Sequence, residues 1–306
     1  MSTLLVGHPT CLLHDMGYGH PECPDRLRAI DQMIRQTDWG DRLQRVDAPK
    51  LEVEWLNKVH PKHHVKALMA LSPVEGLVAV DGDTSLNPHS IDAALYAAGA
   101  AVYATDQVIQ KAAQNAFCAV RPPGHHAESV IAMGFCLFNS VALAAERALA
   151  AGMQRVAILD FDVHHGNGTV EIFQDRPEVL VCSSFQYPFY PGRFDRVERP
   201  NICLTPLSAG TDSDLFRAAV EPQWRQAIHS HQPEMLFISA GFDAHREDPL
   251  GGLNLVDEDY LWVTELIQDL AQENAEGRVV SLLEGGYNLE ALARSVKQHL
   301  EGLVNP

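Results

Sequence analysis

The sequence predicts a single α/β domain of three layers, in which a mainly parallel sheet of about eight strands lies between two layers of helices. Short apolar runs that are typical of buried strands alternate with longer segments of helical periodicity along most of the chain. Strands and helices that alternate in this way form parallel sheets covered on both faces. The 306 residues contain no internal repeat, low-complexity segment or linker, so we expect one domain over residues 1–306.

The N-terminal half begins with an apolar strand at residues 4–7 and a helix that Pro24 opens, since proline suits the first helical position. The other elements expected here are strands at residues 43–46 and 116–120 and helices at 51–70, 91–113 and 139–151. The 51–70 helix would carry His60, His63 and His64. No carboxylate is placed to complete a metal site with them, so we interpret them as surface or capping residues.

The C-terminal half contains most of the predicted strands. Strands are expected at residues 156–160, 179–183, 202–205, 235–239 and 279–283, and helices near 212–231, near 256–272 and from Asn288 onward. In sheets of this kind, ligands bind beyond the carboxyl ends of the strands. The polar, glycine-containing segments that follow these strands are therefore the candidate functional residues.

Composition excludes some classes of partner. Asp and Glu number 40 against 23 Lys and Arg, for a formal net charge of −17, which argues against nucleic acid as a partner. A negative surface suits a cationic substrate, although it serves solubility equally well. The six cysteines form no C-x-x-C motif, which indicates a reducing, cytoplasmic location and no disulfide framework. We find no signal peptide and no apolar run of membrane-spanning length, so no membrane partner is expected.

A metal site is suggested by the segment that follows the 156–160 strand. Asp160, Asp162 and His164 alternate there, and alternate side chains at a strand end lie on one side. Carboxylates and an imidazole together suit a divalent transition metal. A solvated polar turn would give the same pattern, so this motif alone does not decide.

Three further strand ends carry unusual chemistry. His125 and His126 follow a rigid Arg-Pro-Pro-Gly turn and suit general acid and base work, although tandem histidines also occur as surface residues. Asp243 is a candidate third metal ligand, or else a loop acid or helix cap. Tyr287 follows two glycines and is a candidate oxyanion donor, or else a packed tyrosine. Three protein ligands that leave one position open are typical of catalytic zinc.

The order and spacing of these motifs resemble the zinc-dependent histone deacetylases of the arginase–deacetylase superfamily, over nearly the whole chain. The motifs that carry the resemblance are His20-Pro-Glu-Cys-Pro-Asp-Arg26, Arg121-Pro-Pro-Gly-His-His-Ala127, Gly134-Phe-Cys-Leu-Phe-Asn139, Asp160-Phe-Asp-Val-His-His-Gly-Asn-Gly-Thr169, Ala240-Gly-Phe-Asp243 and Glu284-Gly-Gly-Tyr287. Asn167 and the segment Asp248-Pro-Leu-Gly-Gly252 resemble the class II branch, which includes bacterial homologues.

The resemblance implies a fold of the arginase–deacetylase type and an amidohydrolase that removes acetyl or other acyl groups from the ε-amino group of lysine. It implies one zinc ion held by Asp162, His164 and Asp243, which polarises the amide carbonyl and activates water. His126 would act as general base and then as acid. Tyr287 would donate a hydrogen bond to the tetrahedral intermediate.

The resemblance also implies supporting roles. Asp160 would orient His125, which assists electrostatically, and Asn167 would lie behind His126, where some relatives have aspartate. The residues implied to contact substrate or product are Phe135 and Tyr190 as walls of a lysine slot, Gly134 through its carbonyl, and Arg26 along an exit path for the released acid. Relatives often have phenylalanine at the position of Tyr190, which would make this slot more polar.

Potassium is the second cofactor that the resemblance implies, as one or two structural ions. The first site would involve Asp160, Asp162, His164, Ser183 and Ser184. The second would use backbone groups of Phe173, Arg176 and Val179.

Other functions remain open at this point. The substrate is either an acyl-lysine peptide or protein, or a small acylated amine such as an acetylpolyamine. Some polyamine-selective relatives place an acid where this chain has Leu250, so leucine favours acyl-lysine. A binuclear manganese ureohydrolase shares the fold but needs further bridging aspartates. A non-catalytic binding module is disfavoured because Tyr287 and the metal ligands are present. A homo-oligomer is possible.

Overall fold

Eight parallel strands form the centre of the molecule in the computed structural model, which describes residues 2–304. Their order across the sheet is β2-β1-β5-β10-β9-β6-β7-β8, and each neighbouring pair is parallel. The bounds are β1 Thr3–Gly7, β2 Leu43–Asp47, β5 Asn115–Cys118, β6 Val156–Asp160, β7 Val179–Gln186, β8 Ile202–Leu207, β9 Leu236–Ala240 and β10 Val279–Leu283. Every residue of the central strands β5, β6, β9 and β10 is buried, because helices cover both faces.

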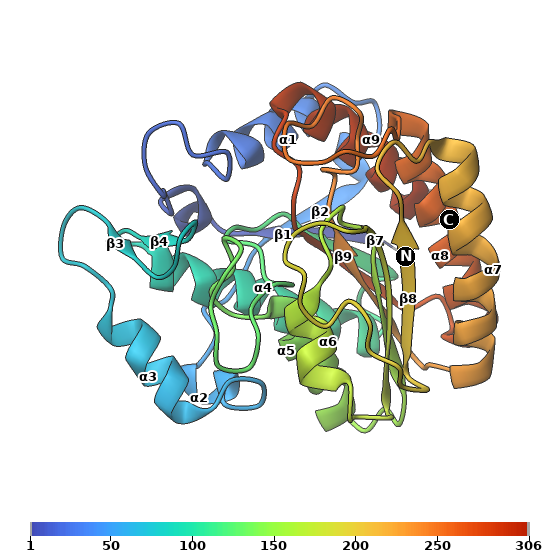
Figure 1. Cartoon of the computed structure of the whole chain (residues 1–306), viewed down its shortest axis with the longest axis horizontal. Coiled ribbons are helices and arrows are strands. Elements are labelled where there is room, and N and C mark those ends of the chain that lie inside the picture. Colours follow the sequence, from blue (N-terminus) through green and yellow to red (C-terminus); the bar gives the residue numbers. More distant parts are fainter. Residues whose placement is uncertain (1, 305–306) are drawn as a thin grey trace.

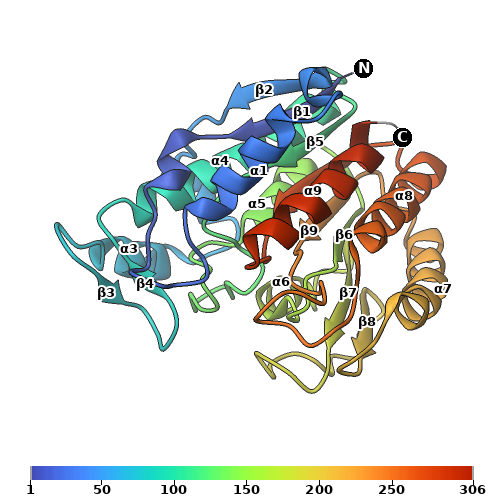
Figure 2. The ribbon, with the colours of Figure 1, turned by 90° about the horizontal axis from the view of Figure 1, so that it is seen from above.

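Two layers of helices enclose this sheet (Figures 1 and 2). On one face, α1, α9, α8 and α7 pack side by side, and on the other face α4 packs on α5 and α5 on α6. The bounds are α1 Asp25–Arg35, α4 Ser90–Ile109, α5 Ser140–Ala150, α6 Asn167–Phe173, α7 Ser213–His231, α8 Asp257–Asn274 and α9 Leu289–Val304. The predicted three-layer architecture with about eight mainly parallel strands is therefore confirmed.

The segment between β2 and α4 differs from the sequence prediction. The single helix predicted over residues 51–70 is wrong: the chain forms α2 (Val53–Leu56) and α3 (Lys62–Ala70). Residues 57–60 turn between them, and Pro61 stands directly before α3 in a non-helical conformation. A small antiparallel hairpin follows, made by β3 (Val78–Ala79) and β4 (Ser85–Leu86). These elements project from one side of the molecule (Figure 1).

The interpretation of the 60–64 histidines is wrong in part. His63 is exposed, but His60 is buried. The imidazole of His60 accepts a hydrogen bond from the backbone N–H of Asn139 at 3.0 Å and lies 3.2 Å from the carbonyl of Ser129. Burial lowers its pKa to about 4, so this imidazole is neutral and serves as a structural hydrogen-bonding group.

The sheet topology explains why distant sequence motifs meet. Strands β5, β10, β9 and β6 are neighbours at the centre, and the segments after their carboxyl ends hold the tandem histidines, Tyr287, Asp243 and the Asp160–His164 motif. Parallel strands place all four of these ends along one edge. Within residues 2–304 no helix is both long enough and apolar enough to span a bilayer.

Candidate metal centre and active site

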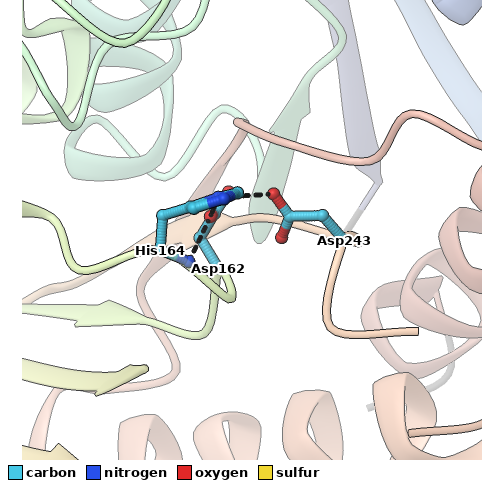
Figure 3. A group of neighbouring side chains, drawn as sticks. All are labelled: Asp162, His164 and Asp243. Atoms are coloured by element: carbon cyan, nitrogen blue, oxygen red, sulfur yellow. Dashed lines mark hydrogen bonds and ion pairs between the residues drawn. The ribbon is translucent and has the colours of Figure 1, made fainter. Parts of the chain in front are cut away.

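Three buried side chains converge beyond the ends of β6 and β9 (Figure 3). The Nδ1 atom of His164 lies 3.2 Å from Oδ1 of Asp162 and 3.1 Å from Oδ2 of Asp243. Zinc bonds of about 2 Å at tetrahedral angles place neighbouring ligand atoms roughly 3.3 Å apart. The spacing and the donor types therefore fit a small divalent metal ion.

The electrostatics of this group also fit a cation. Burial and the charge of Asp162 raise the pKa of Asp243 to about 7. Burial opposes the charged form of His164, but its contacts with Asp162 and Asp243 raise its pKa to about 10. A proton on His164 thus occupies the space between two buried carboxylates, where a metal ion would supply the positive charge instead.

Backbone groups hold the two carboxylates in place. The N–H of Gly285 donates to Oδ2 of Asp162 at 2.8 Å, and the N–H of Val163 donates to Oδ1 of Asp243 at 2.9 Å. A methyl group on Gly285 would overlap Oδ2 of Asp243, so the approach of β10 to this site requires glycine. These contacts orient the carboxylates before any metal binds.

The tandem histidines lie beside this group in two different environments. Their rings are 4.0 Å apart. The Nδ1 atom of His125 lies 2.9 Å from Oδ2 of Asp160, and the Nδ1 atom of His126 lies 2.7 Å from Oδ1 of Asn167. Burial would lower the pKa of His125, but the charges of Asp160 and Asp162 hold it well above its usual value.

The neighbouring imidazole behaves in the opposite way. Burial and the positive charges of His125 and His164 hold the pKa of His126 well below its usual value. A charged imidazole therefore stands next to a neutral one. In such a pair the charged imidazole can stabilise negative charge, and the neutral imidazole can accept a proton.

Glu284 is a site residue to which sequence reasoning assigned no role. Its Oε2 atom accepts hydrogen bonds from the N–H groups of Gly124 and His125, at 2.7 and 3.1 Å. Burial raises the pKa of Glu284 to about 7. Its position directly before the Gly-Gly-Tyr287 motif was the signal in the sequence. The contacts show that Glu284 anchors the turn that presents the tandem histidines.

A cavity of about 470 Å³ leads to this group. The residues that line it are Asp83, His126, Gly134, Phe135, His164, Phe189, Tyr190, Pro249, Leu250, Gly251, Gly252 and Tyr287. The cavity therefore brings together the predicted residues Gly134, Phe135, Tyr190, Leu250 and Tyr287. Asp83 and Phe189 were not predicted.

Aromatic rings form the walls of this cavity. The rings of Phe135 and Tyr287 meet edge to face at 5.8 Å, and Tyr190 meets His126 in the same way at 5.2 Å. Phe189 stacks on His164 at 5.3 Å. Burial and the charge of Asp243 hold the pKa of Tyr287 well above its usual value, so its hydroxyl stays protonated and can donate.

Arg26 does not line this cavity. Its buried guanidinium donates to the carbonyls of Gly286 and Glu284 at 2.6 and 2.5 Å. It lies 5.0 Å from the ring centre of Tyr287. Arg26 therefore contacts Tyr287, which lines the cavity, without lining it itself.

The first group predicted for potassium combines Asp160, Asp162 and His164, at and after the end of β6, with the β7 serines Ser183 and Ser184. The Oγ atom of Ser183 is 3.1 Å from Nδ1 of His165, and Ser184 donates to the carbonyl of Asp160 at 3.4 Å. The carbonyls of the second predicted group, Phe173, Arg176 and Val179, all accept from Nδ2 of Asn201, at 2.8, 3.0 and 2.9 Å. Three carbonyl oxygens thus converge on one point.

Comparison with known proteins places this chain in a family. The histone deacetylase domain matches residues 20–303. The chain belongs to the histone deacetylase family. A histone deacetylase-like amidohydrolase of Pseudomonas aeruginosa is 36% identical over 278 residues, covering 88% of this chain and 73% of the relative. A probable deacetylase of Archaeoglobus fulgidus is 34% identical over 302 residues, covering 95% and 82%.

A solved structure gives the same result for the fold. The crystal structure of the HDA15 HD domain superposes with a TM-score of 0.92 at 34% identity, covering 99% of this chain and 90% of that one. The predicted fold of the arginase–deacetylase type is thus confirmed, and with it the resemblance drawn from the sequence. Membership of this family of amidohydrolases makes the protein a hydrolase of the deacetylase kind.

Metal affinity of the metal-free protein is expected to depend on pH in two stages. Because the pKa of His164 is about 10 and that of Asp243 about 7, zinc displaces about one proton between these values and about two below pH 7. Affinity should fall about tenfold for each pH unit lost in the upper range and more steeply in the lower one. Competition with a chelator of known affinity, over a pH series, measures this slope.

The control for this measurement is His229→Gln, which removes an exposed histidine that pairs with Glu273 at 2.9 Å. This variant should keep the same slope. An affinity for zinc that does not change with pH would contradict the protonation states given above.

Proposed function

We propose that this protein is a zinc-dependent amidohydrolase that removes acetyl or other acyl groups from the ε-amino group of lysine side chains. The observation that carries the proposal is the convergence of Asp162, His164 and Asp243 beside a cavity that His126 and Tyr287 also line. Family membership supports the reaction type. The metal and the substrate are inferred from the donor set and the shape of the cavity.

Zinc is the metal that we propose for the three-residue site. Two carboxylates and one imidazole leave a fourth position open, as catalytic zinc sites do. Zinc, when bound, supplies Lewis acidity that polarises an amide carbonyl and acidifies water. We also propose one or two structural potassium ions, at the Ser183–Ser184 region and at the carbonyls that converge on Asn201.

The side chains around the metal site supply the proton transfers. His126 is kept neutral, so its imidazole accepts a proton from the attacking water and returns it to the leaving amine. His125, which Asp160 keeps charged, stabilises negative charge beside it. Tyr287 stays protonated and donates a hydrogen bond to the carbonyl oxygen as that oxygen becomes negative.

The cavity walls hold the substrate. Phe135 and Tyr190 enclose the alkyl chain and exclude water, and the carbonyl of Gly134 accepts a hydrogen bond from the amide N–H. Arg26 contacts the ring of Tyr287, and we propose that it lines the exit of the released acid. These roles follow the family resemblance, and the geometry of the cavity is compatible with each.

Acyl-lysine is favoured over an acylated polyamine by the apolar side chain of Leu250 in the cavity wall. A cationic amine in the slot would lack a charge partner at this position. One observation supports the polyamine alternative, since the acid Asp83 also lines the cavity. Asp83 already accepts a hydrogen bond from Thr84 at 2.7 Å, and we therefore assign it less weight.

Replacement of Tyr287 tests the catalytic proposal. Tyr287→Phe should lower kcat for an acetyl-lysine peptide by about 100-fold or more, because one donor to the developing oxyanion is lost. The zinc content should stay the same. Tyr18→Phe, at a fully exposed tyrosine, is the matched control and should have no effect. An unchanged rate in the Tyr287 variant would remove this residue from the mechanism.

Replacement of Leu250 tests the substrate class. The unmodified protein should hydrolyse acetyl-lysine peptides with a higher kcat/KM than acetylspermidine. Leu250→Glu should shift this ratio toward acetylspermidine, because the added carboxylate attracts the cation. Leu250→Gln has nearly the same shape without the charge and should not. A strong preference of the unmodified protein for acetylspermidine would overturn the choice of acyl-lysine.

A further inference from the structure

A chain of hydrogen bonds leads from His126 away from the cavity. Nδ2 of Asn167 donates to Oε1 of Glu128 at 2.7 Å. Arg193 then donates to both oxygens of Glu128, from Nε and from an Nη atom, each at 2.7 Å. The carboxylate of Glu128 is buried, with 3% of its surface exposed, while the Arg193 side chain is 44% exposed.

The carboxylate fixes which way the amide of Asn167 points. A carboxylate paired through both oxygens with a guanidinium accepts hydrogen bonds and does not donate them. Asn167 must therefore turn its NH₂ group toward Glu128 and its carbonyl oxygen toward His126. Nδ2 of Asn167 also donates to the carbonyl of His126, at the longer distance of 3.4 Å, so Glu128 provides the short contact that holds the amide in this orientation.

The orientation of this amide decides the tautomer of His126. Oδ1 of Asn167 can only accept, and it lies 2.7 Å from Nδ1 of His126. Nδ1 therefore carries the hydrogen, and the free lone pair is on Nε2. A reversed amide would present a donor to Nδ1 and place the hydrogen on Nε2, where the general base needs its lone pair.

Arg193 links this arrangement to the wall of the cavity. It lies between β7 and β8, three residues after Tyr190, whose ring meets that of His126. Glu128 lies two residues after His126. The ion pair thus connects the segment that carries the cavity wall with the segment that carries the imidazole.

We propose that Glu128 and Arg193 are positioning residues that fix the amide of Asn167 and, through it, the Nδ1-protonated tautomer of His126. This inference rests on the proposed function, because it explains how the general base is held ready. Neither residue lines the cavity. Their effect is expected on kcat and on the imidazole itself, with little change in KM.

The test exchanges the carboxylate and the amide between positions 128 and 167, using side chains of nearly the same shape. In Glu128→Gln, residue 128 can donate or accept, so it no longer fixes the amide of Asn167, which keeps only its weaker 3.4 Å contact with the carbonyl of His126. In the double variant Glu128→Gln with Asn167→Asp, the new glutamine donates to the new aspartate. The other oxygen of that aspartate again accepts from Nδ1 of His126, which restores the original polarity.

Two readouts are needed. The ¹⁵N chemical shifts of the imidazole of His126 report the tautomer in the metal-free protein at mildly alkaline pH, with His126→Gln as the assignment control. Steady-state kinetics on an acetyl-lysine peptide report kcat and KM. We expect the Nδ1–H tautomer in the unmodified protein and mixed tautomers in Glu128→Gln. Its kcat should fall at least about tenfold, within the contribution of a general base, and the double variant should recover most of the loss.

Arg193→Met should give a smaller change in the same direction, because it frees the carboxylate of Glu128. The matched control is Arg199→Met in the same segment, which breaks a surface contact with Asp175 at 3.1 Å and should change neither readout. Unchanged ¹⁵N shifts in Glu128→Gln, or a loss that the double variant does not recover at an equal unfolding temperature, would overturn the inference. Failure of the proposed function is distinguishable, because the shifts need no substrate.

Discussion

The site depends on the approach of two buried carboxylates, Asp162 and Asp243, to one imidazole nitrogen of His164. Burial and the repulsion between these like charges together raise the pKa of Asp243. The arrangement persists because backbone N–H groups hold both acids and because a positive charge lies between them. A divalent ion satisfies the same requirement more fully than a proton, which is why the geometry indicates a metal centre.

The parallel sheet makes this convergence possible. Four adjacent central strands deliver their carboxyl ends to one edge, so residues as distant as His126 and Tyr287 line one cavity without any long connection between them. The turn after β10 lies so close to the metal site that residue 285 has no room for a side chain, because a methyl group there would overlap Asp243. The fold therefore places the site residues, and the charges around them keep His125 protonated and His126 neutral.

Much of this was predictable from the sequence. The alternation of strands and helices gave the layers, and polar motifs after four apolar runs indicated the metal ligands, the tandem histidines and Tyr287. The break at Pro61 and the burial of His60 were missed because helical periodicity continues through that segment. Glu128 and Arg193 lie 65 positions apart, and only the folded loops bring them together. The roles of the site residues stay predictions.

The most direct test is the anomalous scattering of crystals of the purified protein at the zinc absorption edge. One zinc ion per chain, bonded to Asp162, His164 and Asp243 with one coordination position left to solvent, is the result expected. Two neighbouring metal ions, or a metal ion bound away from these residues, would contradict a mononuclear deacetylase centre.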